Sequence, residues 1–136
     1  MLQLKTKDDI GAFLEEHGYK VSVQEEGVLV LEDEDGLNIF AAADETQLEF
    51  MVNLCSVNDL DTSRLAEIYE RILDQNTEIL PSCFGIDSDD PSDKRIVLVD
   101  SIATANLDEN ELLLSLDALT VNVVTAHDLL QPYFKK

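Results

Sequence analysis

The sequence of 136 residues predicts an α+β fold, in which helices pack on one face of an antiparallel sheet. Apolar residues recur at helical spacing near the N-terminus, over residues 60–76 and from residue 108 to 130. Alternating or wholly apolar runs, which are typical of strands, separate these helices. The predicted order is helix, four strands, helix, two strands and a long helix. We expect residues 1–136 to form a single domain, because this length is enough to bury a core.

The first helix has recognisable start and stop signals. Thr6 and Asp9 have the spacing of a capping box, with Asp in place of Glu. Gly18 stands where a helix commonly ends. Between these signals the apolar residues are three and four positions apart: Ile10, Phe13 and Leu14.

Four strand-like runs follow this helix: residues 19–23, 28–31, 37–41 and 46–54. The pair Asp35-Gly36 between the second and third runs is a strong hairpin signal. Several of the runs alternate apolar and polar residues, which is typical of an antiparallel sheet with one covered face.

The second helix is expected over residues 60–76. Its N-cap is one of three residues: Asp61, Thr62 or Ser63. Pro81 prevents the helix from continuing past Leu80. Residues 82–86 then read as a strand, residues 87–93 as a hairpin loop, and the apolar run from Arg95 as a well-buried strand.

The long helix has the clearest start in the chain. Asp108 is a good N-cap with Glu111 three residues later, and Leu107 and Leu112 flank the pair as a hydrophobic staple. The β-branched stretch 120–125 lowers helix propensity, but the apolar periodicity runs through it, which favours a continuous helix. One apolar stripe results: Leu112, Leu116, Leu119, Val123, Ala126 and Leu130.

The net charge is −20, with 29 acidic and 9 basic side chains. It is spread evenly along the sequence, at −11 over residues 1–60 and −9 over residues 61–136. Nucleic acid and anionic lipid are therefore poor partners, because no basic patch is available to bind phosphate. Basic proteins and cations remain possible partners. The alternative explanation is that the charge only keeps the protein soluble.

No uninterrupted apolar run approaches the roughly 18 residues of a membrane span, and the N-terminus lacks the apolar core of a signal peptide. We therefore expect a cytoplasmic protein. Cys55 and Cys83 are far apart and form no CxxC motif, so we expect two free thiols.

Several segments together resemble a known family: Leu73–Asn76, Leu80-Pro81, Phe84, Val97–Val99, Asp117–Leu119 and Asn122–Val124. They are similar to the bacterial family typified by YjfI. The order of helices and strands resembles the type III secretion chaperone-like fold, shared with YbjN-type proteins. The resemblance implies dimers, protein clients and no established activity. It also implies a phage-shock-protein-A-like membrane-remodelling protein as a partner, and it supplies no catalytic residue.

The acidic loop suggests a calcium site, and its weak candidate ligands are Asp87, Asp89, Asp90 and Asp93. An EF-hand loop that started at Asp87 would have Pro91 at position 5 and Leu98 at position 12, which does not fit. His17 and His127 lack zinc-ligand spacing. The sequence shows neither a G-x-S-x-G elbow nor a glycine-rich phosphate loop, so we expect neither an enzyme nor a cofactor.

The long helix carries apolar residues beyond its main stripe: Leu113, Leu114, Val121 and Val124. These residues are predicted to form a dimer seam or a client-binding surface. Burial of both helix faces within one chain is an equally good explanation. We therefore expect an acidic adaptor or chaperone-like homodimer that binds a basic or amphipathic segment of a partner protein. The alternative is a cation-responsive regulatory domain using the loop 87–93.

Overall fold

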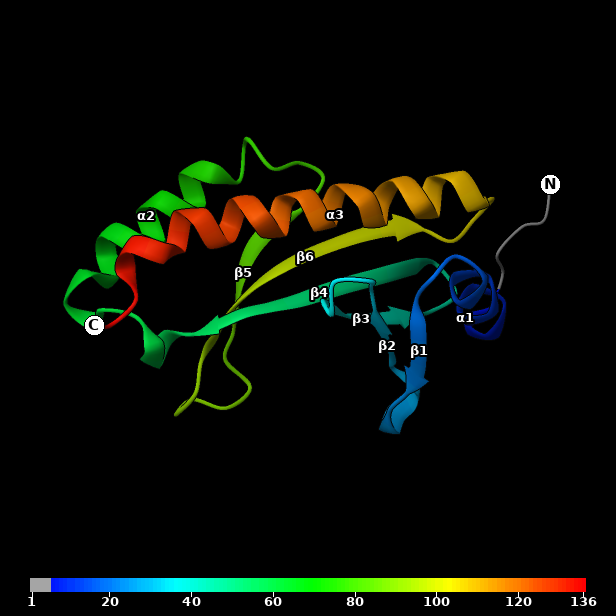
Figure 1. Ribbon diagram of the computed structural model, residues 1–136, viewed down its shortest axis with the longest axis horizontal. Helices are drawn as coiled ribbons and strands as arrows, with labels where there is room; N and C mark the ends of the chain where they lie inside the picture. The colour runs from blue at the N-terminus through cyan, green and yellow to red at the C-terminus, as the bar shows by residue number, and fades with distance from the viewer. Residues whose placement is uncertain (1–5) are drawn as a thin grey trace. The chain divides into compact units, whose positions relative to one another are not determined.

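The computed structural model describes residues 6–136, which form three helices and a six-stranded antiparallel sheet (Figure 1). The elements are α1 (Lys7–Glu16), β1 (Lys20–Val23), β2 (Leu29–Glu32), β3 (Asn38–Ala43), β4 (Gln47–Ser56), α2 (Leu65–Gln75), β5 (Cys83–Asp87), β6 (Arg95–Ala103) and α3 (Glu109–Leu130). The strand order in the sheet is β1-β2-β3-β4-β6-β5. The predicted element order and the α+β class are both confirmed.

The chain packs as two compact units. Unit 1 comprises the described residues up to Val52 together with Asp100–Leu116, and unit 2 comprises Asn53–Val99 and Asp117–Lys136. The strands β4 and β6 and the helix α3 each contribute residues to both units. The single domain expected from length therefore stays a prediction.

In unit 1, one face of the sheet is covered by α1. The backbone of α1 approaches the sheet at Gly11, where an added Cβ would lie 3.6 Å from Val21 Cγ1 and 4.0 Å from Leu29 Cδ1. On this face Leu31 is paired with Val21 and Ile39, and both Leu31 and Ile39 are fully buried. Buried and partly exposed residues alternate along β2, as expected for a sheet with one covered face.

The ends of α1 follow the predicted signals. The Asp9 amide donates to Thr6 Oγ1 (3.1 Å) and the Thr6 amide to Asp9 Oδ2 (3.3 Å), which completes the capping box. Gly18 follows with φ +93°, a conformation that favours glycine.

In unit 2, α2 begins later than predicted, because residues 62–64 form a 3₁₀ turn. Asp61 is the cap of that turn and accepts hydrogen bonds from the Ser63 amide (3.1 Å) and hydroxyl (2.6 Å). At the other end of α2, Asn76 Oδ1 accepts from the Phe84 amide (2.7 Å). This bond occupies an amide of β5, the strand at the edge of the sheet.

Figure 1 shows α2 beside the C-terminal half of α3. Tyr133, in the 3₁₀ turn after α3, is buried, and Arg71 of α2 donates a hydrogen bond to its hydroxyl (3.1 Å). The guanidinium carbon of Arg64 lies 4.5 Å from the centre of the same ring. Cation–π and hydrogen-bond contacts therefore hold α2 to the end of α3.

The helix α3 is continuous through residues 120–125, as predicted. Its start is capped by Asp108, whose Oδ1 accepts from the Glu111 amide (2.8 Å). The six residues of the predicted apolar stripe are all buried: Leu112, Leu116, Leu119, Val123, Ala126 and Leu130.

By length and composition, residues 109–133 are apolar enough to cross a membrane. Polar residues interrupt this segment, so it contains no uninterrupted apolar run long enough to predict a membrane span. The core helix of a soluble protein has the same properties. In α3, 28% of this apolar stretch is buried, and its buried residues belong to the core.

Candidate protein-binding surface

The face of α3 opposite its buried stripe presents two valines to solvent. Val121 and Val124 are 65% and 60% exposed, and both belong to unit 2. Asp117 and Asp128 are also exposed. At 100° per residue these four side chains project within about 60° of one another around the helix. We call Asp117, Val121, Val124 and Asp128 the α3 stripe.

The other two residues predicted for this surface, Leu113 and Leu114, belong to unit 1, and the name α3 stripe covers only residues of unit 2. Leu114 is 59% exposed, whereas Leu113 is half-buried. Exposure of three of the four rules out the alternative in which both faces of α3 are buried within the chain. Their predicted role in binding stays a prediction.

A loop of unit 2 is tied to α3 through Asn122. Asn122 Nδ2 donates to the carbonyl of Ile79 (2.6 Å) and to the hydroxyl of Ser82 (3.1 Å). Both of these residues are buried, whereas Leu80 between them is 73% exposed. The sequence predicts Leu80 only as a boundary before Pro81. The local pattern does not show which way its side chain points, so its exposure was not predicted.

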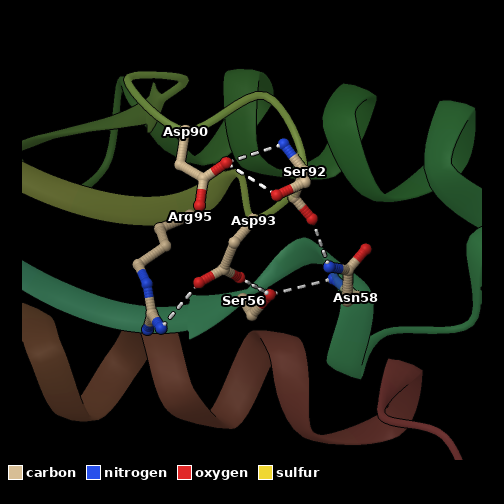
Figure 2. A network of polar contacts seen from close by, with 6 residues as sticks. All are labelled: Ser56, Asn58, Asp90, Ser92, Asp93 and Arg95. Atoms are coloured by element: carbon tan, nitrogen blue, oxygen red, sulfur yellow. Dashed lines mark hydrogen bonds and ion pairs between the residues drawn. The ribbon is translucent and has the colours of Figure 1, made fainter.

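Figure 2 shows how the acidic loop is held at its C-terminal end. Ser56 Oγ donates to Asp93 Oδ1 (2.5 Å), and Arg95 Nη2 donates to Asp93 Oδ2 (3.0 Å). The Asn58 side chain donates to the Ser92 carbonyl (2.9 Å). The hydrogen bond from Ser56, followed by the charge of Arg95, holds the pKa of Asp93 below its ordinary value. These contacts join the hairpin loop to the end of β4.

Two further aspartates of this loop, Asp87 and Asp90, accept hydrogen bonds from the loop itself. Asp87 Oδ1 accepts from the Asp89 amide (3.1 Å), and Asp90 Oδ1 accepts from the Ser92 amide (3.0 Å) and hydroxyl (2.7 Å). Within residues 6–136, no group of three or more His, Cys, Asp or Glu side chains is arranged to hold a metal ion. The contacts give the loop an architectural role.

The predicted free thiols differ in environment. Cys55 is buried, and this burial raises its pKa to about 11, with a smaller effect from the charge of Asp59. Cys55 is therefore a neutral thiol near pH 7 and a poor nucleophile. Cys83 is free and exposed on β5.

The two histidines lie where their helices end. His17 caps the C-terminus of α1, with Nδ1 2.9 Å from the Phe13 carbonyl oxygen. His127 lies exposed in the last turn of α3.

Charge is divided unevenly between the two units, although it is spread evenly along the sequence. The segments of unit 1 carry 17 acidic and 3 basic side chains, a net charge of −14. Those of unit 2 carry 12 acidic and 6 basic side chains, a net charge of −6. No Lys or Arg occurs between Arg95 and Lys135, so α3 has no basic side chain except His127.

The order of helices and strands is that of a chaperone-like α+β fold, and α3 presents an exposed, acid-flanked face. The family CesT_Tir_1, which is type III secretion chaperone-like, matches residues 3–136, and the chain belongs to this family. Among curated proteins none matches the chain.

Among solved structures, YbjN from E. coli is similar to this chain. The TM-score is 0.69 and the identity is 13%, over 94% of this chain and 96% of that one. At this identity the likeness shows the fold alone. YbjN is described as a candidate transcription regulator, and that description applies to YbjN.

Proposed function

We propose that this chain is a non-enzymatic adaptor or chaperone-like protein that holds a basic or amphipathic segment of a partner protein on α3. The observation that carries the proposal is the exposure of Val121 and Val124 between Asp117 and Asp128. A chaperone-like fold suggests a role in binding proteins, and the α3 stripe is the surface on which we place it.

Both the apolar and the acidic parts of the α3 stripe favour a protein segment with positive charge. Covering the two valines removes apolar surface from water, which favours association. The flanking carboxylates attract cationic side chains and repel acidic ones, which contributes mainly to specificity and to the association rate. No comparable observation supports the cation-responsive alternative, because within residues 6–136 no group of three or more His, Cys, Asp or Glu side chains is arranged to hold a metal ion.

A homodimer is the competing explanation for the same surface, as the sequence analysis anticipated. A phage-shock-protein-A-like protein is the partner that the family resemblance suggests. The proposal includes the cytoplasmic location that we expected from the lack of a signal-peptide core and of a long uninterrupted apolar run. One crosslinking experiment distinguishes a second copy of this chain from a partner protein on the α3 stripe. The sequence of the crosslinked peptide shows which of the two is bound.

The test places a photo-crosslinking amino acid at Val124 in the full chain. The matched control has the same amino acid at Val23, a valine of unit 1 that is 61% exposed. We expect position 124, but not position 23, to crosslink a partner segment rich in Lys or Arg, identified by mass spectrometry. Crosslinking to a second copy of this chain, or equal crosslinking at both positions, would contradict the proposal.

A further inference from the structure

The α3 stripe has the same order of residues when read from either end. Asp117, Val121, Val124 and Asp128 are separated by four, three and four positions. At 1.5 Å per residue, the two aspartate Cα atoms are about 16 Å apart along the helix axis. The two valines lie symmetrically between them.

This symmetry disfavours a second copy of the chain as the occupant. In an antiparallel two-fold pair centred between Val121 and Val124, Asp117 of each copy would lie opposite Asp128 of the other. Two pairs of like charges would then meet, one at each end of the contact. Such pairs oppose association, and α3 offers no Lys or Arg to compensate them.

We infer that the occupant of the α3 stripe is a cationic amphipathic helix, an inference that rests on the proposed function and specifies its partner. The helix carries Lys or Arg at positions i and i+11 and apolar residues at i+4 and i+7. These positions share one helix face, so two apolar contacts and two ion pairs form together. Because the α3 stripe is symmetric, such a helix satisfies it in parallel or antiparallel orientation.

A helix fits this surface better than an extended segment does. Two helices packed side by side have the same rise per residue, so residues spaced four, three and four apart on one stay level with the same spacing on the other. An extended segment advances about 3.3 Å per residue and turns alternate side chains away. It would cover the distance of about 16 Å with five residues and place its side chains out of step with the valines.

The test uses two labelled peptides of about 18 residues with the same helix-forming sequence. One has Lys at positions i and i+11, and the other has Glu at both positions. Fluorescence anisotropy measures their binding to the full chain at low salt. We expect the Lys peptide to bind about tenfold more tightly, the scale of two exposed ion pairs. Added salt should narrow this difference.

Three variants of the full chain locate the binding. The double variant Asp117→Asn, Asp128→Asn should remove the preference for Lys over Glu. The double variant Val121→Ser, Val124→Ser should weaken both peptides severalfold, whereas the control Val23→Ser should change neither. Equal binding of the two peptides to the unaltered chain, or unchanged binding to the valine variant, would overturn the inference.

The failure of this inference is distinguishable from the failure of the proposed function. If position 124 crosslinks a basic partner segment that lacks the i, i+4, i+7, i+11 pattern, the proposed function stands and the helical partner is wrong. If position 124 crosslinks no basic segment and neither peptide responds to the variants, both are wrong.

Discussion

Asp100 is a buried residue whose surroundings disfavour its charged form. It is only 6% exposed, its Oδ1 accepts from the Ser101 amide (2.7 Å), and its Oδ2 has no hydrogen-bond partner within residues 6–136. Burial raises the pKa of this carboxyl, and the Ser101 amide opposes that rise only in part. An ionised Asp100 therefore destabilises the fold at neutral pH.

The substitution Asp100→Asn tests this destabilising effect, because the stability difference between variant and parent should depend on pH. Because the folded-state pKa of Asp100 is raised, its stabilising contribution is complete below the unfolded-state pKa and is lost as pH rises through the folded-state pKa. At pH 8 the variant should therefore be more stable than the parent by about 1 kcal/mol. This difference is measured as a higher melting temperature. This gain should shrink as pH falls through the folded-state pKa toward the unfolded-state pKa, about 3.9. A difference that does not change with pH would show that ionisation of Asp100 is not the cause.

Asn122 is the residue that fixes the loop carrying Leu80. Its substitution by Ala would leave the Ile79 carbonyl and the buried Ser82 hydroxyl without the donor they share. We expect a loss of about 1–3 kcal/mol in the free energy of unfolding, measured in urea. The exposed helix residue Asp128→Ala is a suitable control and should change stability by less than about 0.5 kcal/mol. Equal effects of the two substitutions would contradict the role given to Asn122.

At the scale of elements, α3 has two apolar faces with opposite roles. Leu119 is fully buried, whereas Val121 is 65% exposed two residues later. Leu119→Ala should therefore cost about 2–5 kcal/mol of stability, because it removes buried methyl groups and leaves a cavity. Val121→Ala should stay within about 0.5 kcal/mol, since alanine leaves no cavity there and favours helix. Denaturation in urea measures both, and similar losses would show that the face with Val121 is covered.

The sequence predicted best the helix ends that depend on residues a few positions apart. The capping box at Thr6 and the N-cap at Asp108 depend on residues three positions apart, and the sequence displays them directly. The helix through residues 120–125 was predictable because its apolar period survives the β-branched residues. The 3₁₀ turn at residues 62–64 was not predicted, because several residues near it can cap a helix.

The candidate surface was only partly predictable for a different reason. The helical period places Val121 and Val124 away from the main stripe, so their exposure follows from the sequence once α3 is accepted as a helix. The position of Leu80 depends on Asn122, 42 residues further along the chain. Contacts between residues so far apart leave no local signal in one sequence.

At the scale of the whole molecule, the distribution of net charge depends on the fold more than on the order of residues along the chain. The two halves of the sequence differ little, yet the segments of unit 1 carry −14 and those of unit 2 carry −6. Long-range folding collects the acidic turns of the first 52 residues with the acidic start of α3 at 108–111. Like charges within one compact unit repel one another, which opposes folding.

Salt should therefore stabilise this protein. Raising NaCl from a few millimolar to about 0.5 M shortens the Debye length several-fold and screens the repulsion within unit 1. We expect the melting temperature to rise by roughly 3–5 °C for each kcal/mol of repulsion that is screened. A few millimolar CaCl₂ should act no differently from NaCl of equal ionic strength, because no group of three or more His, Cys, Asp or Glu side chains within residues 6–136 is arranged to hold a cation. A melting temperature that falls with NaCl would contradict the repulsion, and a specific rise with calcium would restore the acidic loop as a cation site.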